Sequence, residues 1–272
     1  MTQLVGSVLV RNEDRFVEQA VLNIASCCDR IYAHDHVSDD DTWEILRRLA
    51  SQLDHLEVHR TRRTSDSQKP LERYAGTQTW VLGVDGDELY DPAALAKLRD
   101  ALTAGEHSDV FRLKGHVLNC EELDMDSRSA SGYMAPPSRP ITKLFNFGAV
   151  SSWTGSSHRL HDGWPAFRPG FHWESLRYLS ETTSWEDDPL RCLHVCFLPR
   201  STRDRESPVR LNPVETGMYD RTLVGRLKRK VRAPAIDPKI VELHHAGTDW
   251  KREWYARGER VRVDAGPFLG GR

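Results

Sequence analysis

The chain has 272 residues, enough for one large domain or two smaller ones, and 39% of them are hydrophobic, which allows a sizeable core. Its formal net charge is −2 at pH 7, although Arg outnumbers Lys by 30 to 8. This balance argues against a general nucleic-acid-binding protein, because such proteins carry a broad surplus of basic residues. No apolar stretch of the sequence has the length needed to cross a bilayer.

Two further features bear on the compartment. Residues 1–14 lack the basic start, the long apolar stretch and the cleavage site of a signal peptide. The five cysteines match neither the spacing of a zinc site nor a disulfide framework; they are Cys27, Cys28, Cys120, Cys192 and Cys196. We therefore expect a cytoplasmic protein.

The first hundred residues alternate between short apolar segments and segments with helical periodicity. Val-rich runs predict buried strands, and apolar residues spaced three and four apart predict helices. The last helix is well marked, with Asp91 to cap it, Pro92 in its first turn and Gly105 to end it. The predicted elements are a strand over 4–10, a helix from Asp14, a strand over 30–35, a helix over 43–53, a strand over 56–60, a short helix from Leu71, a strand over 80–85 and a helix over 91–105.

This order of elements predicts an α/β fold in which a mostly parallel sheet is covered by helices on both faces. After about residue 110 the regularity fades, and the C-terminal half is expected to be more irregular. Its predicted segments are a strand over 109–118, a mobile loop over 127–140, two short strands within 141–160, a strand over 191–198, a basic segment over 226–230 and a closing helix within 248–263.

Polar clusters follow three of the predicted strands. They are "RNED" at 11–14, "DHVSDDDT" at 35–42 and "DGDE" at 85–88. In open parallel sheets ligands bind beyond the carboxyl ends of the strands, where these clusters are expected to meet. Each cluster alone is compatible with an ordinary solvated loop, but the three together predict a site.

The cluster at 85–88 is the most unusual, since Asp85, Asp87 and Glu88 repel one another directly after an apolar strand. Such carboxylates suit a hard divalent cation. Mg²⁺ and Mn²⁺ normally take one or two protein carboxylates and leave room for phosphate oxygens. Gly86 between the acids lets the backbone turn tightly and approach a ligand. The cluster therefore favours a metal–diphosphate site, with a plain solvated turn as the alternative.

These motifs carry a resemblance over about residues 4–105. "VLVRNEDRF", "DHVSDDDT" and "DGDE" occur in the order and spacing typical of a GT-A-fold glycosyltransferase, specifically the bacterial family 2 type. The resemblance implies a Rossmann-like GT-A fold in which 1–115 form the nucleotide-sugar-binding half. Residues 116–272 then form the acceptor-binding half and the C-terminal tail of the same continuous domain.

The resemblance also implies roles for individual residues. Arg11, Asn12 and Glu13 line the nucleotide edge, Asp35 accepts a hydrogen bond from the base, and Arg73 contacts the donor. Asp85 faces the ribose or the diphosphate with Gly86 beside it, Asp87 ligates Mn²⁺ or Mg²⁺, and Glu88 supports the turn. A surface ion pair is the alternative for Glu13 and Arg73.

The second half resembles the family less closely. His158 and His194 are candidates for a metal-binding histidine, with an ordinary structural role as the alternative. The position after His158 is Arg159 where family members often have Glu. A general base is needed to deprotonate the acceptor hydroxyl. "SWEDDP" offers Glu186 and Asp187 for that role, and a second acidic segment offers Glu121, Glu122, Asp124 and Asp126.

The sequence thus predicts a metal-dependent glycosyltransferase that moves a sugar, with inversion, from a nucleotide-diphosphate sugar to a hydroxyl or amine. The donor is expected to be a UDP- or GDP-sugar, and the acceptor a soluble natural product or small glycan, with no nucleic acid as a partner. A retaining transferase of the same fold, a nucleotidyltransferase and a non-catalytic sugar- or partner-binding protein are the alternatives. Against the nucleotidyltransferase, no Gly-rich loop follows the first strand.

Overall fold

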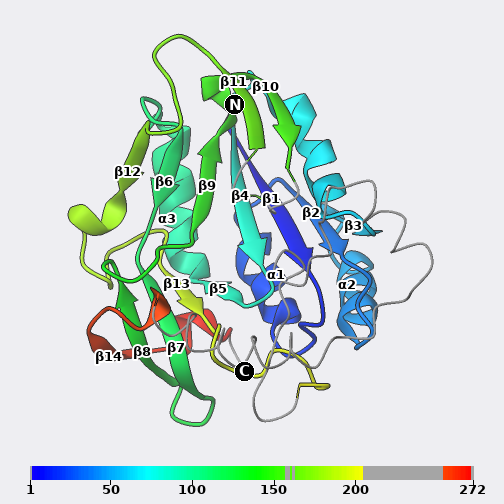
Figure 1. The fold of residues 1–272 in the computed structure, drawn as a ribbon, viewed down its shortest axis with the longest axis vertical. Helices are drawn as coiled ribbons and strands as arrows, with labels where there is room; N and C mark the ends of the chain where they lie inside the picture. The colour runs from blue at the N-terminus through cyan, green and yellow to red at the C-terminus, as the bar shows by residue number, and fades with distance from the viewer. Residues whose placement is uncertain (1, 157–159, 161–162, 205–253, 271–272) are drawn as a thin grey trace, which may run out of the picture.

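The computed structural model describes residues 2–156, 160, 163–204 and 254–270, and Figure 1 shows their arrangement. A seven-stranded sheet has the order β12-β6-β9-β4-β1-β2-β3, with β9 and β12 contributed by the second half of the chain. All neighbouring pairs are parallel except the two that β9 makes. The strands are β1 (Gln3–Val10), β2 (Arg30–Asp35), β3 (Leu56–Arg60), β4 (Thr79–Asp85), β6 (Arg112–Lys114), β9 (Lys143–Asn146) and β12 (Leu176–Tyr178).

Three α-helices cover one face of this sheet: α1 (Val17–Ala25), α2 (Thr42–Ala50) and α3 (Pro92–Thr103). The other face differs from the prediction of helices on both sides. It is covered by the 3₁₀ segment η1 (Thr64–Tyr74) and by the hairpin of β10 (Val150–Gly155) and β11 (Gly163–Phe167). Pro70 lies inside η1, and this residue type removes a helical hydrogen bond, which is consistent with 3₁₀ rather than α geometry here.

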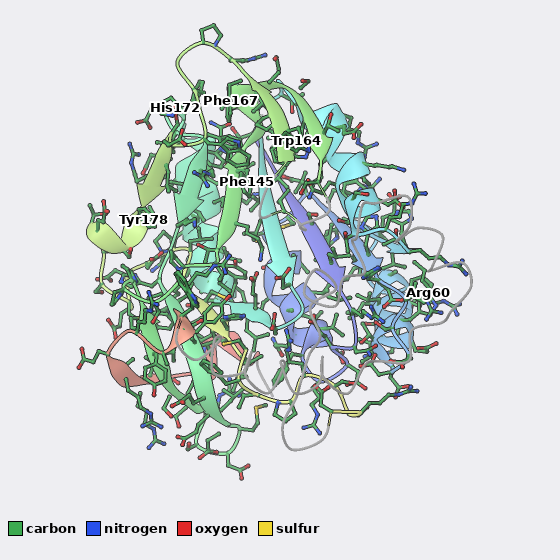
Figure 2. The ribbon with its side chains drawn as sticks, viewed as in Figure 1. Arg60, Phe145, Trp164, Phe167, His172 and Tyr178 are labelled. Carbon is green, nitrogen blue, oxygen red and sulfur yellow. The ribbon has the colours of Figure 1, made fainter. Side chains whose placement is uncertain are left out.

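Many of the aromatic residues of the second half pack into the core on this second face. Phe145 and Phe167 both point into it in Figure 2, and Phe111 contacts both rings, at centroid distances of 5.4 and 4.9 Å. Trp153 and Trp173 extend the cluster. Trp164 is the exception, because 74% of its surface is exposed. Most of the aromatic residues of this region are therefore core residues, not a binding surface.

A second, mixed sheet has the order β14-β8-β7-β13-β5. Its strands are β5 (Glu88–Tyr90), β7 (Val117–Asp124), β8 (Ser129–Ala135), β13 (Cys192–His194) and β14 (Arg260–Asp264). Short 3₁₀ turns η2 (Phe147–Ala149), η4 (Leu179–Glu181) and η5 (Gly266–Phe268) complete the described elements.

Several predictions for the second half are wrong. Residues 129–135 of the predicted mobile loop form β8, which pairs with β7 on one side and β14 on the other. Residues 260–263 of the predicted closing helix lie in β14 (Arg260–Asp264) instead. The predicted strand over 109–118 divides into β6 and β7, and the one over 191–198 is only Cys192–His194. The basic segment 226–230 lies outside the described residues.

The two sheets meet at the acid turn, which we define as Asp85–Gly86–Asp87–Glu88. Asp85 is the last residue of β4 in the parallel sheet, and Glu88 is the first residue of β5 in the mixed sheet. The register pairs Leu9 with Asp85 and Val10 with Asp35. This confirms that the carboxyl ends of β1, β2 and β4 share one edge. Among the described residues, no helix is both long and apolar enough to span a membrane.

Candidate functional site

The acid turn lies at this shared edge and is buried. Asp85 is 7% exposed, Asp87 2% and Glu88 0%, and Glu13 from the segment after β1 is also fully buried beside them. Four carboxyl groups removed from water in one place require compensating charge, because an isolated buried carboxylate is strongly disfavoured.

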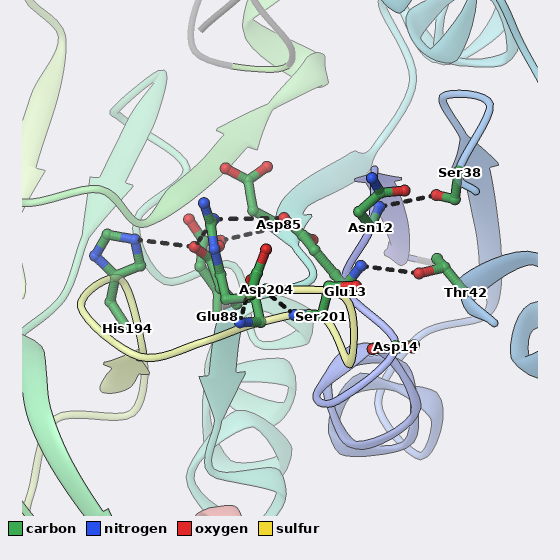
Figure 3. A network of polar contacts seen from close by, with 12 residues as sticks. Asn12, Glu13, Asp14, Ser38, Thr42, Asp85, Glu88, His194, Ser201 and Asp204 are labelled. Atoms are coloured by element: carbon green, nitrogen blue, oxygen red, sulfur yellow. Dashed lines mark hydrogen bonds and ion pairs between the residues drawn. The ribbon is translucent and has the colours of Figure 1, made fainter. Parts of the chain in front are cut away.

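Two basic side chains from distant segments supply positive charge. Lys143, at the start of β9, places its Nζ 2.5 Å from Glu88 Oε1 and 3.4 Å from Asp85 Oδ2. Arg200 contacts Asp87 and lies 3.4 Å from Glu13 Oε1. His194 on β13 also approaches Asp87, with Nε2 3.7 Å from Asp87 Oδ2 (Figure 3). Its Nδ1 is 2.9 Å from Asn119 Oδ1. The repulsion among the acids is thus offset within the protein itself.

Glu88 holds the turn in shape. Its Oε2 accepts a hydrogen bond from the backbone N–H of Asp85 at 3.1 Å. Burial raises the pKa of Glu88 to about 8; the Lys143 ammonium opposes this shift, and the Asp85 and Asp87 charges add to it. The raised pKa favours the protonated form of Glu88 in the folded protein, and Lys143 contacts both this carboxyl group and that of Asp85.

Gly86 is required for the close approach of the segment after β1. A Cβ at this position would lie 2.1 Å from Glu13 Oε2 and 2.9 Å from Val10 Cγ1. The sequence indicated a glycine that lets a ligand approach the backbone. The structure shows that the space beside Gly86 is occupied by Glu13.

The polar clusters after β1 and β2 are joined by hydrogen bonds. The Asn12 N–H donates to Ser38 Oγ at 2.9 Å, and Asn12 Oδ1 accepts from the Asp39 N–H at 3.0 Å. The Glu13 N–H donates to Thr42 Oγ1 at 2.8 Å. Asn12 has a φ of 53°, a left-handed conformation that asparagine tolerates better than most residues. The turn after β1 is therefore held rigidly against the turn after β2.

Asp35 lies at the end of β2 and is fully buried. Its carboxylate accepts hydrogen bonds from the Ser38 N–H at 3.1 and 3.2 Å and pairs with Arg60 Nε at 3.0 Å. Arg60 lies at the outer edge of the sheet in Figure 2. Asp35 thus lies at the sheet edge with a positive charge beside it, and its role in binding the base stays a prediction.

The remaining predicted residues lie elsewhere. Arg11 is exposed beside the edge. Arg73 lies on the rings of Tyr32 and Tyr74 in mid-sheet, its guanidinium carbon 5.5 and 5.2 Å from their centroids. His158 falls outside the described residues.

Glu186 and Asp187 are exposed in the loop before β13. Arg191 bonds the backbone oxygens of Trp185 and Glu186 and also pairs with Asp91 at the start of α3. Strand β13 pairs His194 with Glu88 and Cys192 with Tyr90, so this loop precedes the end of β13 that is farther from the acid turn. The role of either carboxylate as general base stays a prediction.

Sequence reasoning missed the two cations. Lys143 belongs to the "TKLFNF" segment that was noted for its resemblance, but no role was given to its amine. Arg200 follows β13 in the chain, and no sequence motif marks it. Charge balance was the available signal, since a buried group of acids needs basic partners from somewhere in the chain.

The acid turn was also tested for its fit to Mn²⁺ or Mg²⁺. Among the described residues, no three His, Cys, Asp or Glu side chains are arranged to hold a metal ion. The carboxylate oxygens of Asp85 and Asp87 are nonetheless hard ligands, and these ions use only one or two protein carboxylates when a diphosphate supplies the others. The donor chemistry fits such a shared site, with Arg200 on the same carboxylate of Asp87.

Comparisons with known proteins found little. No protein-family model matches the chain, and no curated protein matches it. Among solved structures, a mannosyltransferase from Pyrobaculum calidifontis in complex with GDP-Man and Mn²⁺ is 21% identical with a TM-score of 0.31, and the match covers 45% of this chain and 36% of that chain. A mannose-6-phosphate isomerase from Helicobacter pylori is 7% identical with a TM-score of 0.30, covering 53% and 60%. The chain thus spans less than two thirds of each, and these values are too low to carry an argument.

Proposed function

We propose that this protein is a metal-dependent glycosyltransferase that transfers a sugar from a nucleotide-diphosphate sugar to a hydroxyl or amine of a soluble acceptor, with inversion. The observation that carries the proposal is the meeting of three motif segments at one edge of a parallel sheet. Asn12, Asp35 and the acid turn are far apart in sequence, and the strand register brings them together. This is the edge where open α/β sheets bind nucleotides.

The chemistry along this edge supports the following position for the donor. The base and ribose lie over the ends of β1 and β2, where Asp35 is held by Arg60 and Ser38 and where Asn12 fixes the adjoining turn. The diphosphate lies toward the acid turn at the end of β4. Arg11 is exposed beside this path and adds positive charge to it.

Asp87, with Asp85, holds Mn²⁺ or Mg²⁺ together with the diphosphate. When bound, the ion neutralises the negative charge that develops on the leaving nucleoside diphosphate. Lys143 and Arg200 keep the carboxylates of the turn in position before the donor arrives, which lowers the cost of assembling the site. His194 adds a third group beside Asp87 that can carry positive charge.

The acceptor half begins near residue 116, with the mixed sheet, and supplies the general base. Glu186 and Asp187 stay the proposed source of that base. Direct displacement needs the base on the face of the sugar opposite the diphosphate, and it needs a hydroxyl within hydrogen-bond reach of that base.

Nucleotide binding tests the proposal first. Calorimetric titration of the full chain with UDP, GDP and dTDP, each with and without Mn²⁺, is expected to show metal-dependent binding of at least one of them. Asp87→Asn keeps the size of the side chain and is expected to weaken that binding at least about 10-fold. Asp54→Ala, an exposed acid in the turn before β3, is the matched control and should bind like the wild type.

Slow release of nucleoside diphosphate from the matching sugar nucleotide then separates an enzyme from a binding protein. Turnover that is lost in Asp87→Asn and kept in Asp54→Ala supports the transferase. If no nucleotide binds with or without Mn²⁺ while the protein is folded by circular dichroism, the proposed function is wrong.

A further inference from the structure

A cavity of about 130 Å³ is lined by β6, by β9 and by residues 139–142 before β9. Its lining includes four basic residues and no acidic one: Arg112, Lys114, Arg139 and Lys143. Lys143 connects the cavity to the site already described, because its ammonium group contacts Asp85 and Glu88. The other three cations face a space that the proposed nucleotide and metal do not use.

These three cations have no carboxylate partner among the residues that the structure describes. Arg112 donates to the backbone oxygen of Trp173 and stacks on its ring, with 5.0 Å between guanidinium carbon and ring centroid. Its Nε–H has no acceptor in the described part of the chain. Lys114 lies 6.0 Å from the ring of Tyr178, which Figure 2 labels on β12. Arg112 and Lys114 are two residues apart on β6 and so project to the same side of the strand.

The electrostatics of Lys114 show how costly this arrangement is without a bound anion. Burial, together with the charges of Arg112, Arg139 and Lys143, lowers the pKa of Lys114 to about 8. Like charges that face one another in a partly buried cavity raise the free energy of the empty state. An anion placed among them offsets that repulsion, which favours its binding.

The place of the cavity in the fold separates it from the donor. The sheet order is β6-β9-β4-β1-β2, so the cavity lies on one side of β4 and Asp35 lies on the other. With the nucleotide over β1 and β2 and the diphosphate at the end of β4, the β6–β9 side is left for the acceptor. This step rests on the proposed function.

We propose that the cavity binds a phosphoryl group carried by the acceptor, so that the substrate of this enzyme is a phosphorylated compound. A phosphate monoester carries nearly two negative charges near neutral pH and three acceptor oxygens. That charge matches a cluster of three cations, whereas a single carboxylate leaves most of the positive charge without a partner. Arg112 and Arg139 offer the forked N–H donors that suit phosphate oxygens, and Lys114 adds a point charge.

Calorimetric titration with methyl phosphate tests the cavity without knowledge of the acceptor. The wild-type protein is expected to bind it, and Lys114→Met to bind it at least about 10-fold more weakly, a difference of about 1.4 kcal/mol. Arg139→Gln, which alters a second lining cation at an exposed position, is expected to weaken binding in the same direction. Lys97→Met on the exposed side of α3 is the matched control and should leave binding unchanged.

Two further arms identify the source of the anion. Acetate should bind much more weakly than methyl phosphate if the site selects a phosphoryl group, and equal binding overturns that selection. The nucleotide found to bind with Mn²⁺ should bind Lys114→Met as it binds the wild type, and methyl phosphate should not be displaced by it.

The inference is overturned if the wild type binds no methyl phosphate, if Lys97→Met weakens binding as much as Lys114→Met does, or if the nucleotide displaces methyl phosphate. Nucleotide binding that persists in any of these cases leaves the proposed function standing. If the wild-type protein binds no nucleotide, the proposed function is wrong, which is a separate result.

Discussion

At the scale of single residues, Glu88 links the protonation of the site to the stability of the fold. Its pKa rises from 4.5 to about 8 on folding, chiefly through burial. Between these values the unfolded chain carries an ionised Glu88 while the folded chain keeps it protonated, so the folded state binds more protons. Stability from this group is therefore greatest below about pH 4.5 and falls as the pH rises toward about 8.

Glu88→Gln removes this titration while keeping the size of the side chain. We expect the free energy of unfolding of the variant to gain on that of the wild type as the pH rises from about 5 to about 8. Urea unfolding of both proteins across this range measures the difference. Glu72→Gln, at an exposed position, should show a constant offset; a constant offset for Glu88→Gln as well would contradict the assigned pKa.

Arg200 is a basic residue of the site, and it stabilises the fold as the positive partner of buried acids. Arg200→Gln leaves Asp87 and Glu13 without this charge, and removal of one partner of a buried pair typically costs about 3–5 kcal/mol. Arg203→Gln is the control, because Arg203 makes an exposed pair with Asp39, worth about 0–1 kcal/mol. Thermal unfolding measures both effects.

A divalent cation should compensate for the lost arginine if the acid turn accepts one. We expect Mn²⁺ to raise the melting temperature of Arg200→Gln more than that of the wild type, because a ligand that binds only the folded state stabilises it by mass action. Equal responses of the two proteins to Mn²⁺ would show that the ion does not bind at this carboxylate.

At the scale of elements, Asp91 begins α3 and also joins it to the segment before β13. Its Oδ1 accepts from the N–H groups of Ala93 and Ala94 at 2.9 and 3.2 Å, and its Oδ2 pairs with Arg191 at 2.5 Å. Asp91→Ala is expected to cost more than the roughly 1 kcal/mol of a helix cap, since the partly buried Arg191 also loses its partner. Asp91→Asn, which retains the cap, should cost less, and urea unfolding ranks the two. Equal costs would show that the cap alone matters.

The helix α3 and the strand β8 show what a local pattern can and cannot predict. Asp91, Pro92 and Gly105 act within a few residues of one another, so the helix was predictable from sequence. The segment Ser129–Ala135 contains Ser and Gly and suggested a loop. It becomes a strand because β7 and β14 both pair with it. Only glycine fits at position 132, because a Cβ there would lie 2.1 Å from the Asn119 carbonyl oxygen.

The same distinction applies to the site. The carboxylates of the acid turn follow an apolar strand directly, so their common location was visible in the sequence. Lys143 and Arg200 reach them from 55 and 113 residues away, and only tertiary packing brings them there. A sequence pattern therefore predicted which groups need a counter-charge but not which cations supply it.

At the scale of the whole molecule, the two sheets depend on segments from both ends of the chain. Asn23 on α1 donates to the backbone oxygens of Tyr90 and Phe268, at 2.7 and 2.8 Å. Strand β14 pairs with β8, and η5 follows it directly. The N-terminal helix, the strand after the acid turn and the last described turn are thus fastened at one point, so the parallel and the mixed sheets should unfold together.

Phe268 makes this coupling measurable. Its side chain is fully buried, stacks on Trp185 with 5.7 Å between centroids, and has the Arg191 guanidinium over its ring at 5.6 Å. Phe268→Ala removes most of that contact, and such a change in a core typically costs about 3–5 kcal/mol. Phe268→Leu keeps much of the volume and should cost clearly less. If unfolding is a single transition for both sheets, urea unfolding by circular dichroism and by tryptophan fluorescence should shift to the same lower midpoint in Phe268→Ala. A cost below about 1 kcal/mol, or midpoints that separate, would show that the C-terminal turn docks on a unit that folds without it.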